Sequence, residues 1–346
     1  MNTFLKLSPE ERNVYCRQAA EKMHVPLPAA VIEKDFWVCW TLNQLNEIPA
    51  LKGNITFKGG TSLAKAWGLI DRFSEDIDIA VNRKVFRHEP PHGAEHARSN
   101  RQRNIRLEEL EERSVAFIGD VVLPQLKHKI TEQLNEEFAL RLIRKANEVN
   151  IEFEYPGTLK NELGALLPVV LIELVPRADE LPNEERTITP MIHEVFSEIL
   201  GDGSFNIPAL NPERTFLEKL LLIHETMEGF NKGSERKSRH YYDLFKLYHS
   251  GIFEKIKSNR DLLHAVVEHR RTFFRYNTMN YNSILSNGVK VAPPMETRSD
   301  WRSDYARTSI MIYNNIPTFE DLMVFAERME EEFKEWVYNG PGNSEH

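Results

Sequence analysis

The stretch FKGGTSLAKAWGLIDRFSEDIDIAV, residues 57–81, is the part of this chain that most constrains its fold. A short apolar run ends in Gly59-Gly60, and TSLAKAWGL then has the composition of a short helix. The run EDIDIAV alternates carboxylates with aliphatic residues, and alternation at a period of two is typical of a half-buried β-strand. The stretch therefore predicts two strands that are joined by a glycine turn and a short helix.

The two aspartates of the second strand are expected to share one face. Successive side chains on a strand point to opposite faces, so Asp76 and Asp78 lie together while Ile77 and Ile79 enter the core. Adjacent carboxylates repel each other unless a cation lies between them, and Mg²⁺ binds oxygen ligands together with phosphates. The pair predicts a magnesium site, and the alternative is an edge strand with a solvated acidic face.

The glycine turn predicts a phosphate-binding loop. Gly59 and Gly60, followed by Thr61 and Ser62 at a helix start, leave backbone N–H groups unobstructed, and the Ser62 hydroxyl adds a donor. The pattern lacks the Gly-Lys-Ser/Thr ending of the Walker motif and the third glycine of the dinucleotide motif. Gly-Gly also forms ordinary turns. The order of strand, glycine turn, helix and Asp-x-Asp strand favours one site where phosphates and metal meet.

The rest of the chain predicts an α+β fold in two lobes. Residues 1–205 are expected to hold a small mixed sheet flanked by helices, with strands at NIEFEY and PVVLIELV and helices at SPEERNVYCRQAAEKM and LPAAVIEKDFWVCWTLNQLNEI. From about residue 211 onward the pattern is mostly helical. Residues 206–346 are therefore expected to form a helical C-terminal domain.

Composition and charge narrow the class of protein. The formal net charge of −8 argues against a general nucleic-acid coat or a protein that adheres to membranes through charge. The chain shows no secretory leader pattern and no run of about 18 apolar residues. Cys16 and Cys39 lack metal-ligand spacing and lie in apolar helical patterns, which indicates reduced core thiols. These features predict a cytoplasmic protein without a membrane partner.

The motifs resemble those of a known superfamily. GGTSLAKAWGL followed by RFSEDIDI resembles the signature of the DNA polymerase β-like nucleotidyltransferases. The longer form Arg-x-Ser-x-Asp-x-Asp resembles the AbiEii/AbiGii branch, the nucleotidyltransferase toxins of bacterial abortive-infection toxin–antitoxin systems. IEKDFWV, TFLEKLLLIHE, RKSRHYYDLFKL and WRSDYARTSIMIYNNIPTFEDLM are similar to further stretches of that branch, whereas residues 88–106 match none of its motifs.

The resemblance implies a nucleotidyltransferase-type N-terminal lobe and a Mg²⁺-dependent reaction. A nucleoside monophosphate would pass from an NTP to an acceptor, with RNA and the 3′ end of a tRNA as the expected acceptor. The physiological role implied is that of a phage-defence toxin with a cognate antitoxin as partner. Lys219 is expected to neutralise the triphosphate, and Asp243 to orient Lys219 or to act as base on the acceptor hydroxyl. The expected nucleotide-binding residues are Gly59, Gly60, Thr61, Ser62, Arg72 and Ser74, and the expected metal ligands are Asp76, Asp78 and Glu173.

Glu173 is chosen as the third carboxylate because it interrupts an apolar strand, and Glu152 and Glu154 compete with it. Two other function classes stay open. One is a small-molecule nucleotidyltransferase of the antibiotic-modifying kind, which a deep acidic pocket would favour. The other is a non-catalytic member of the superfamily that binds a nucleotide as a signal.

Some charged residues of these motifs also have structural interpretations. Lys219 lies in an amphipathic helix, where a surface lysine is the alternative. Asp243 lies among apolar residues and can form an ion pair with Arg239 or Lys246 instead of an active-site contact. Lys65 follows the glycine turn and is expected to face outward or to contact phosphates only at long range.

Lys34 and Asp35 interrupt an apolar helix. A mutual or interlobe ion pair is the structural interpretation of these two residues, and nucleotide contact is the functional one.

Two basic clusters are candidate RNA-binding surfaces. The first cluster has near-helical spacing, and the alternative to RNA binding is that it forms a solvated helix face. The alternative for the second cluster is that it forms a helix end. The spacing of His88, His92 and His96 around prolines and a glycine argues against a metal site. The first cluster comprises Arg98, Arg101, Arg103 and Arg106, and the second comprises His269, Arg270, Arg271, Arg275 and Tyr276.

Overall fold

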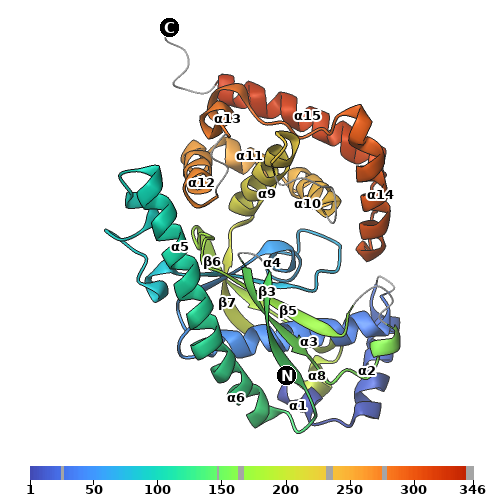
Figure 1. Ribbon diagram of the computed structural model, residues 1–346. Helices are drawn as coiled ribbons and strands as arrows, with labels where there is room; N and C mark the ends of the chain where they lie inside the picture. Colours follow the sequence, from blue (N-terminus) through green and yellow to red (C-terminus); the bar gives the residue numbers. More distant parts are fainter. Residues whose placement is uncertain (25–26, 146–147, 163–166, 231–236, 275–278, 340–346) are drawn as a thin grey trace. The chain divides into compact units, whose positions relative to one another are not determined.

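The computed structural model describes residues 1–24, 27–145, 148–162, 167–230, 237–274 and 279–339. The chain divides into two compact units (Figure 1). The first unit comprises Met1–Gly68 and Phe73–Leu210, and the second comprises Leu69–Arg72 and Asn211–His346. Four residues of the Gly-Gly to Asp-x-Asp stretch thus belong to the second unit, which the sequence pattern did not indicate.

The described strands of the first unit form a seven-stranded mixed sheet in the order β3-β4-β5-β2-β1-β7-β6. The β2–β5 and β1–β7 pairs are parallel and the other pairs are antiparallel. This mixed sheet among helices confirms the α+β class, and β1, β2, β4 and β5 match the predicted strands. The strands are β1 Ile55–Lys58, β2 Ile77–Val81, β3 Ala139–Lys145, β4 Glu148–Glu154, β5 Val169–Val175, β6 Asn183–Ile188 and β7 Phe205–Leu210.

Helix α2 of the first unit begins with a capping box. The Ser8 N–H donates to the Glu11 carboxylate at 2.8 Å and the Glu11 N–H donates to Ser8 Oγ at 3.2 Å, as the sequence predicts. Helices α5 and α6 follow one another along one side of the sheet (Figure 1). The helices are α1 Asn2–Leu5, α2 Pro9–Lys22, α3 Ala29–Asn46, α4 Gly59–Lys65, α5 Asn100–Phe117, α6 Leu123–Gln133, α7 Met191–Val195 and α8 Ser197–Leu200.

Helix α3 is the central helix of the first unit and is buried on nearly all sides. Its Trp37 ring stacks on Tyr155 at a centroid distance of 5.5 Å, and Trp40 lies 6.0 Å from Phe153 on β4. Each fully buried aromatic side chain contributes roughly 1.5–3 kcal/mol through removal of apolar area from water. A helix of this kind is anchored all round, so charged residues on it must find buried partners.

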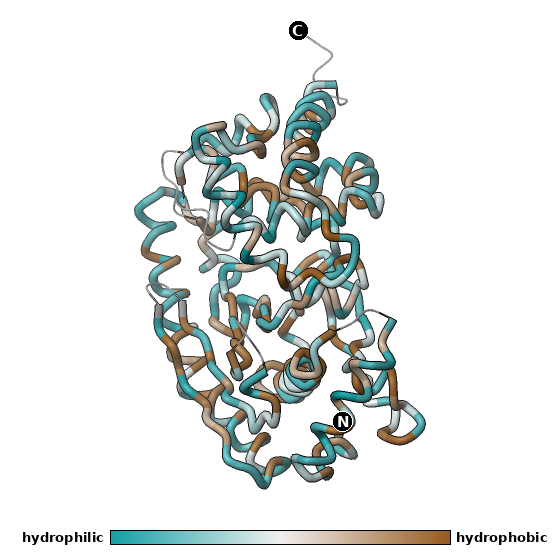
Figure 2. Tube along the Cα trace, turned by 90° about the vertical axis from the view of Figure 1, so that its right-hand side faces the viewer, coloured by the Kyte–Doolittle hydropathy of each residue, from teal (hydrophilic) through white to brown (hydrophobic). Residues whose placement is uncertain are grey.

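The second unit is helical, as predicted. Helix α9 packs against α10, α11 and α12. Figure 2 shows hydrophobic and hydrophilic positions interleaved along the Cα trace of the chain. Leu69–Arg72 joins this unit through a β-bridge between Arg72 and Ile312 and through the Tyr313 N–H, which donates to the Asp71 carbonyl at 3.0 Å. The helices are α9 Pro212–Met227, α10 Ser238–His249, α11 Ile252–Lys257, α12 Arg260–Phe273, α13 Ile284–Asn287, α14 Arg298–Thr308 and α15 Phe319–Tyr338.

In the described ranges, every helix is too short or too polar to cross a bilayer.

Candidate active site

The glycine turn and the Asp-x-Asp strand meet at Gly59 and Asp78. Gly59 begins α4 directly after β1, and Asp78 on β2 lies opposite Lys58 in the antiparallel β1–β2 register. Gly59 has φ of +77°, a conformation that residues with a Cβ rarely adopt. A Cβ at this position would lie 2.7 Å from Asp78 Cγ and would collide with Oδ2. Glycine is therefore required twice over, by its backbone angle and by the carboxylate that lies against its Cα.

The first turn of α4 is tied to the residues just ahead of β2. The Thr61 hydroxyl lies 2.9 Å from Ser74 Oγ and 2.5 Å from the carbonyl oxygen of Asp76. Thr61 and Ser62 are buried, with 1% and 2% of their surface exposed. Because the Thr61 hydroxyl is engaged in these contacts, its position serves to fix the turn against the segment that carries Asp76.

Asp78 belongs to a row of polar residues across the sheet. In the register, Asp78 lies opposite Lys58 on β1 and Glu173 on β5, and Glu173 lies opposite Asn150 on β4. Residues opposite each other on neighbouring strands point to the same face. Asp76 lies one residue ahead of β2.

The competing carboxylates of β4 are engaged elsewhere. Glu152 and Glu154 form ion pairs with the exposed Arg141 at 3.0 and 2.8 Å. Glu173 is thus the carboxylate that the register places beside Asp78. Within the described ranges, no group of three or more His, Cys, Asp or Glu side chains is arranged to hold a metal ion.

The buried charges of α3 have partners within the first unit. Lys34, which is fully buried, donates to the Glu75 carboxylate and to the Leu167 carbonyl, the latter at 2.6 Å. Asp35 lies 2.9 Å from Lys65 Nζ, and its other oxygen accepts the Met191 N–H at 2.7 Å. Both side chains thus bind partners of the first unit, and two of these, Glu75 and Lys65, flank the Asp-x-Asp strand and the glycine turn.

Glu33, the neighbour of Lys34, also binds a loop of the first unit. Its carboxylate accepts the Thr158 N–H and hydroxyl at 2.7 Å each, and the Leu159 N–H at 3.0 Å. These three consecutive charges on α3 thus hold segments from five places in the chain, because α3 is buried on all the sides from which they project.

The expectation that Lys65 faces outward is wrong. Only 10% of its side chain is exposed, and its ammonium is paired with Asp35. Burial lowers the pKa of Lys65, but Asp35 together with Cys39 and Glu194 outweighs burial and raises that pKa above its usual range. Lys65 lies about one helical turn after the glycine turn. Its side chain contacts Asp35 of α3 there instead of solvent.

In the second unit, Asp243 on α10 gathers two cations. Arg72 donates to both carboxylate oxygens of Asp243, at 2.7 and 2.8 Å, and Lys219 Nζ lies 2.9 Å from Oδ2. Lys246, one of the partners expected for Asp243, contacts Asp71 at 2.8 Å instead. Arg236 lies outside the described residues. The structure therefore brings Lys219, Asp243 and Arg72 together, three residues that the sequence assigned to the site.

The environment of Asp243 decides which chemistry it can perform. Burial raises the pKa of Asp243, but Arg72 and Lys219 together outweigh burial and hold that pKa well below its usual range. A carboxylate that stays ionised so strongly is a weak base. The geometry therefore favours the role of orienting Lys219 over that of accepting a proton.

His240 is a member of this group that sequence reasoning missed. Its Nδ1 lies 3.3 Å from Lys219 Nζ, and it precedes Asp243 by three residues on α10. Positions three apart on a helix face the same side, so the spacing to Asp243 was the available signal.

In the second basic cluster, His269 and Arg270 are buried whereas Arg271 is exposed, so the interpretation as an RNA clamp is wrong for Arg270. Arg270 is buried and binds both oxygens of the buried Glu225, which also accepts the Tyr281 hydroxyl at 2.9 Å. Arg275 and Tyr276 lie outside the described residues.

In the first basic cluster, two arginines have local partners and two are exposed. Arg106 donates to the Gly93 carbonyl at 2.6 Å and Arg103 to Asn100 at 2.8 Å, whereas Arg98 and Arg101 face solvent. His88, in the preceding loop, is buried and accepts the Ala94 N–H at 2.9 Å, which is a structural contact.

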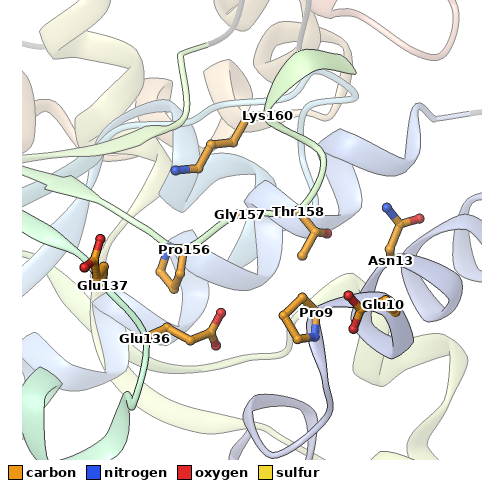
Figure 3. A pocket seen from close by; sticks show the side chains of 9 residues that line it. All are labelled: Pro9, Glu10, Asn13, Glu136, Glu137, Pro156, Gly157, Thr158 and Lys160. Atoms are coloured by element: carbon orange, nitrogen blue, oxygen red, sulfur yellow. The ribbon is translucent and has the colours of Figure 1, made fainter.

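A surface pocket of about 730 Å³ lies in the first unit (Figure 3). Its described lining comes from the start of α2, the residues after α6 and the loop that Glu33 holds. None of the lining residues is a predicted site residue, so the pocket is separate from the glycine turn. The lining residues are Pro9, Glu10, Asn13, Glu136, Glu137, Pro156, Gly157, Thr158 and Lys160.

Comparison with known families assigns the chain to a class of enzyme. A family model matches residues 40–334, a range that includes the glycine turn, the Asp-x-Asp strand, Lys219 and Asp243. The model describes a nucleotidyltransferase, so the protein is an enzyme of that class. More particularly, the chain belongs to the family described as "Nucleotidyl transferase AbiEii toxin, Type IV TA system".

Two solved structures are similar to the chain at low identity. JHP933 from Helicobacter pylori has 12% identity and a TM-score of 0.38, with 88% of this chain and 95% of that chain covered. MenT4, a nucleotidyltransferase toxin from Mycobacterium tuberculosis H37Rv, has 15% identity and a TM-score of 0.39, with 96% and 98% covered. Comparison with curated proteins gives no match.

Proposed function

We propose that the protein transfers a nucleoside monophosphate from an NTP to an RNA end, such as the 3′ end of a tRNA, with Mg²⁺. In the cell it acts as the toxin of a phage-defence pair that a cognate antitoxin restrains. The observation that carries the proposal is the approach of Asp78 to the Cα of Gly59. It joins a carboxylate suited to a metal and a turn suited to a phosphate at one point of the first unit.

The residues at this point fit a magnesium ion. Asp76 and Asp78 offer carboxylate oxygens, the ligand type that Mg²⁺ prefers, and the phosphates of the NTP supply further oxygens. The absence of a Cβ at Gly59 keeps backbone and carboxylate in contact, so both can face the same phosphate. When bound, Mg²⁺ neutralises charge on the phosphates and orients them for displacement.

The chain's own groups bind and orient the triphosphate. The first N–H groups of α4 have no partner within the helix, so Gly59, Gly60 and Thr61 can donate to a phosphate. Ser62 is buried, which favours backbone donors over its hydroxyl. Ser74 fixes this turn through Thr61.

In the reaction, the acceptor hydroxyl releases its proton to solvent and attacks the α-phosphorus, and the bond from that phosphorus to the bridging oxygen breaks as pyrophosphate leaves. Lys219 neutralises the charge that develops on the leaving group. Asp243 and Arg72 orient Lys219, and Asp243 does not serve as the base because its pKa lies well below the usual range. Catalysis of this kind is mostly positioning and electrostatic stabilisation.

One experiment tests the reaction and its acceptor together. Purified protein is incubated with each NTP, radiolabelled in the α-phosphate, together with MgCl₂ and total RNA, purified tRNA or an aminoglycoside mixture. Label in RNA that depends on Mg²⁺ and is absent with Asp78→Asn supports the proposal. Label in the small molecules instead would establish the antibiotic-modifying alternative, and nucleotide binding without transfer would establish the non-catalytic one.

A further inference from the structure

The ammonium group of Lys219 has two acceptors on the same helix. Asp243 Oδ2 lies 2.9 Å from Nζ, and His240 Nδ1 lies 3.3 Å from it. Both acceptors come from α10, whereas Lys219 comes from α9. Lys219 is 8% exposed, so its head group is held in a largely closed environment rather than in open solvent.

The contact fixes the protonation state of the imidazole. An ammonium group only donates hydrogen bonds, so His240 Nδ1 must offer a lone pair, and the ring proton must lie on Nε2. The ring is then neutral. Among the described residues, the charged groups that act on it are Lys219 on α9, Arg239 and Asp243 on α10, and Arg72 on the Leu69–Arg72 segment.

These surroundings agree with a neutral ring. Burial lowers the pKa of His240 well below its usual value, the cations Lys219, Arg239 and Arg72 lower it further, and Asp243 opposes them. A positively charged ring would present an N–H to the Lys219 ammonium and would repel it. The observed contact therefore exists only while the imidazole is neutral.

We propose that His240 is a positioning residue that, together with Asp243, fixes the direction of the Lys219 ammonium group. Two of the three N–H groups of Nζ are then occupied, and the third is left for a phosphate oxygen. This inference rests on the proposed role of Lys219 and is independent of which acceptor receives the nucleotide.

Asp243 by itself does not achieve this orientation. Both of its oxygens are already bound by Arg72, so Lys219 shares Oδ2 and has only one contact there. A single contact leaves the ammonium free to rotate about its last bonds, and the second acceptor removes that freedom. Arg72 donates to both carboxylate oxygens of Asp243 directly, so replacement of His240 leaves the buried Asp243–Arg72 pair in place.

Two variants of nearly equal size separate positioning from packing. His240→Asn can keep an acceptor oxygen at the δ position at every pH, whereas His240→Leu has none. The control is His249→Asn, an exposed histidine on the same helix. We expect His240→Leu to lower kcat for nucleotidyl transfer about tenfold with little change in KM, which corresponds to about 1.4 kcal/mol. His240→Asn is expected to stay within about threefold of the unmodified protein, a difference of under 1 kcal/mol.

The pH profile gives a readout that a structural role would not move. In the unmodified protein, kcat is expected to fall as the pH drops through the lowered pKa of His240, below the usual value of about 6.5. This acid limb should be absent in His240→Asn. Unchanged kcat in His240→Leu, or an acid limb that persists in His240→Asn, would overturn the proposal.

A spectroscopic measurement keeps this inference separate from the proposed reaction. Nitrogen-15 NMR of the histidine rings should show His240 as the Nε2–H tautomer, and Lys219→Met should raise its pKa by removing a facing cation. A ring protonated at Nδ1, or a pKa that ignores Lys219→Met, overturns the positioning role even in a protein without turnover. The predicted tautomer and shift in a protein that transfers no nucleotide would count against the proposed function alone.

Discussion

Asp35 of α3 holds Lys65 of α4 at 2.9 Å, and both side chains are almost fully buried. The pair connects the central helix of the first unit to the helix that the glycine turn begins. A buried ion pair of this kind is costly to break, because the remaining charge has no water to solvate it. The Asp35–Lys65 ion pair therefore helps to hold the helix that begins at the glycine turn against α3.

Replacement of Lys65 is expected to lower the stability of the protein, whereas replacement of Lys219 is expected to lower its activity. Lys65→Met leaves Asp35 buried without its cation and should lower the free energy of unfolding by about 3–5 kcal/mol, measured by chemical denaturation. Adding Asp35→Asn should recover much of that loss, since the amide oxygen can still accept the Met191 N–H. Equal stability of Lys65→Met and the unmodified protein would contradict the buried pair.

Lys219→Ala is expected to lower kcat roughly a hundredfold, about 3 kcal/mol of transition-state stabilisation, because a phosphate gains charge as it leaves. Steady-state transfer rates give the measurement. The matched control is Lys255→Ala, since 67% of that lysine side chain is exposed. Comparable rates for the two variants would remove Lys219 from the reaction.

Gly59→Ala should abolish transfer, whereas Gly53→Ala should not. Both glycines have positive φ, +77° and +70°, so both substitutions carry a backbone cost of about 1–2 kcal/mol. Only at Gly59 does the new methyl group meet a neighbour, the Asp78 carboxylate, while Gly53 has open space around it. Measured stabilities should therefore fall in both variants, with activity lost only in the first. Retained activity in Gly59→Ala would show that the Gly59–Asp78 approach is dispensable.

Asp76→Asn and Asp78→Asn should each reduce transfer by more than about a hundredfold, because oxygen donors to the metal are lost. Chelation of divalent ions should reduce the unmodified protein to the same level, and added Mg²⁺ should restore only that protein. Thermal unfolding curves without metal should change little, since one of two repelling charges is removed. A variant that unfolds would assign the aspartates a structural role instead.

Acid should destabilise the second unit through His224. Burial lowers the pKa of His224 to about 4, and its Nδ1 accepts the Lys290 N–H at 2.9 Å. The unfolded chain takes up the proton near pH 6.5 and the folded chain only near pH 4, so stability is present above pH 6.5 and is lost toward pH 4.

The full effect of His224 is on the order of 3 kcal/mol. His224→Asn should flatten the dependence of unfolding free energy on pH in this window, and the exposed His264→Asn should leave it unchanged. Identical slopes for the two variants would show that other histidines carry the dependence.

Much of the fold could be predicted because its signals are local. Alternation identified β2 and β4, a continuous apolar run identified β5, and the Ser8–Glu11 spacing identified the start of α2. The direction in which charged side chains point depends on what packs against them, which sequence spacing does not contain. For this reason the sequence predicts an exposed Lys65 although Asp35 of α3 binds it, and RNA binding is one of two interpretations of Arg270 although Glu225 neutralises it.

The sequence indicates the residues of the candidate site but not the contacts between them. Short motifs fixed the residue types at Gly59, Asp78, Lys219 and Asp243. The partners of Asp243 are 171 residues away at Arg72 and on the preceding helix at Lys219, and such separations leave no periodic trace. His240 was missed because a lone histidine on an amphipathic helix resembles an ordinary surface residue.

The insertion of Leu69–Arg72 into the second unit has a consequence for how such a chain can change over evolutionary time. The backbone leaves the first unit at Gly68, returns at Phe73 and leaves again after Leu210, so no single cut separates the two units. A gene fusion that exchanged everything after Leu210 would bring in a new helical unit but retain the old Arg72. The carboxylate of the new unit that is equivalent to Asp243 would then have to pair with the Arg72 of the original chain. A chimera joined after Leu210 therefore keeps this buried ion pair only if its new unit places a carboxylate against Arg72.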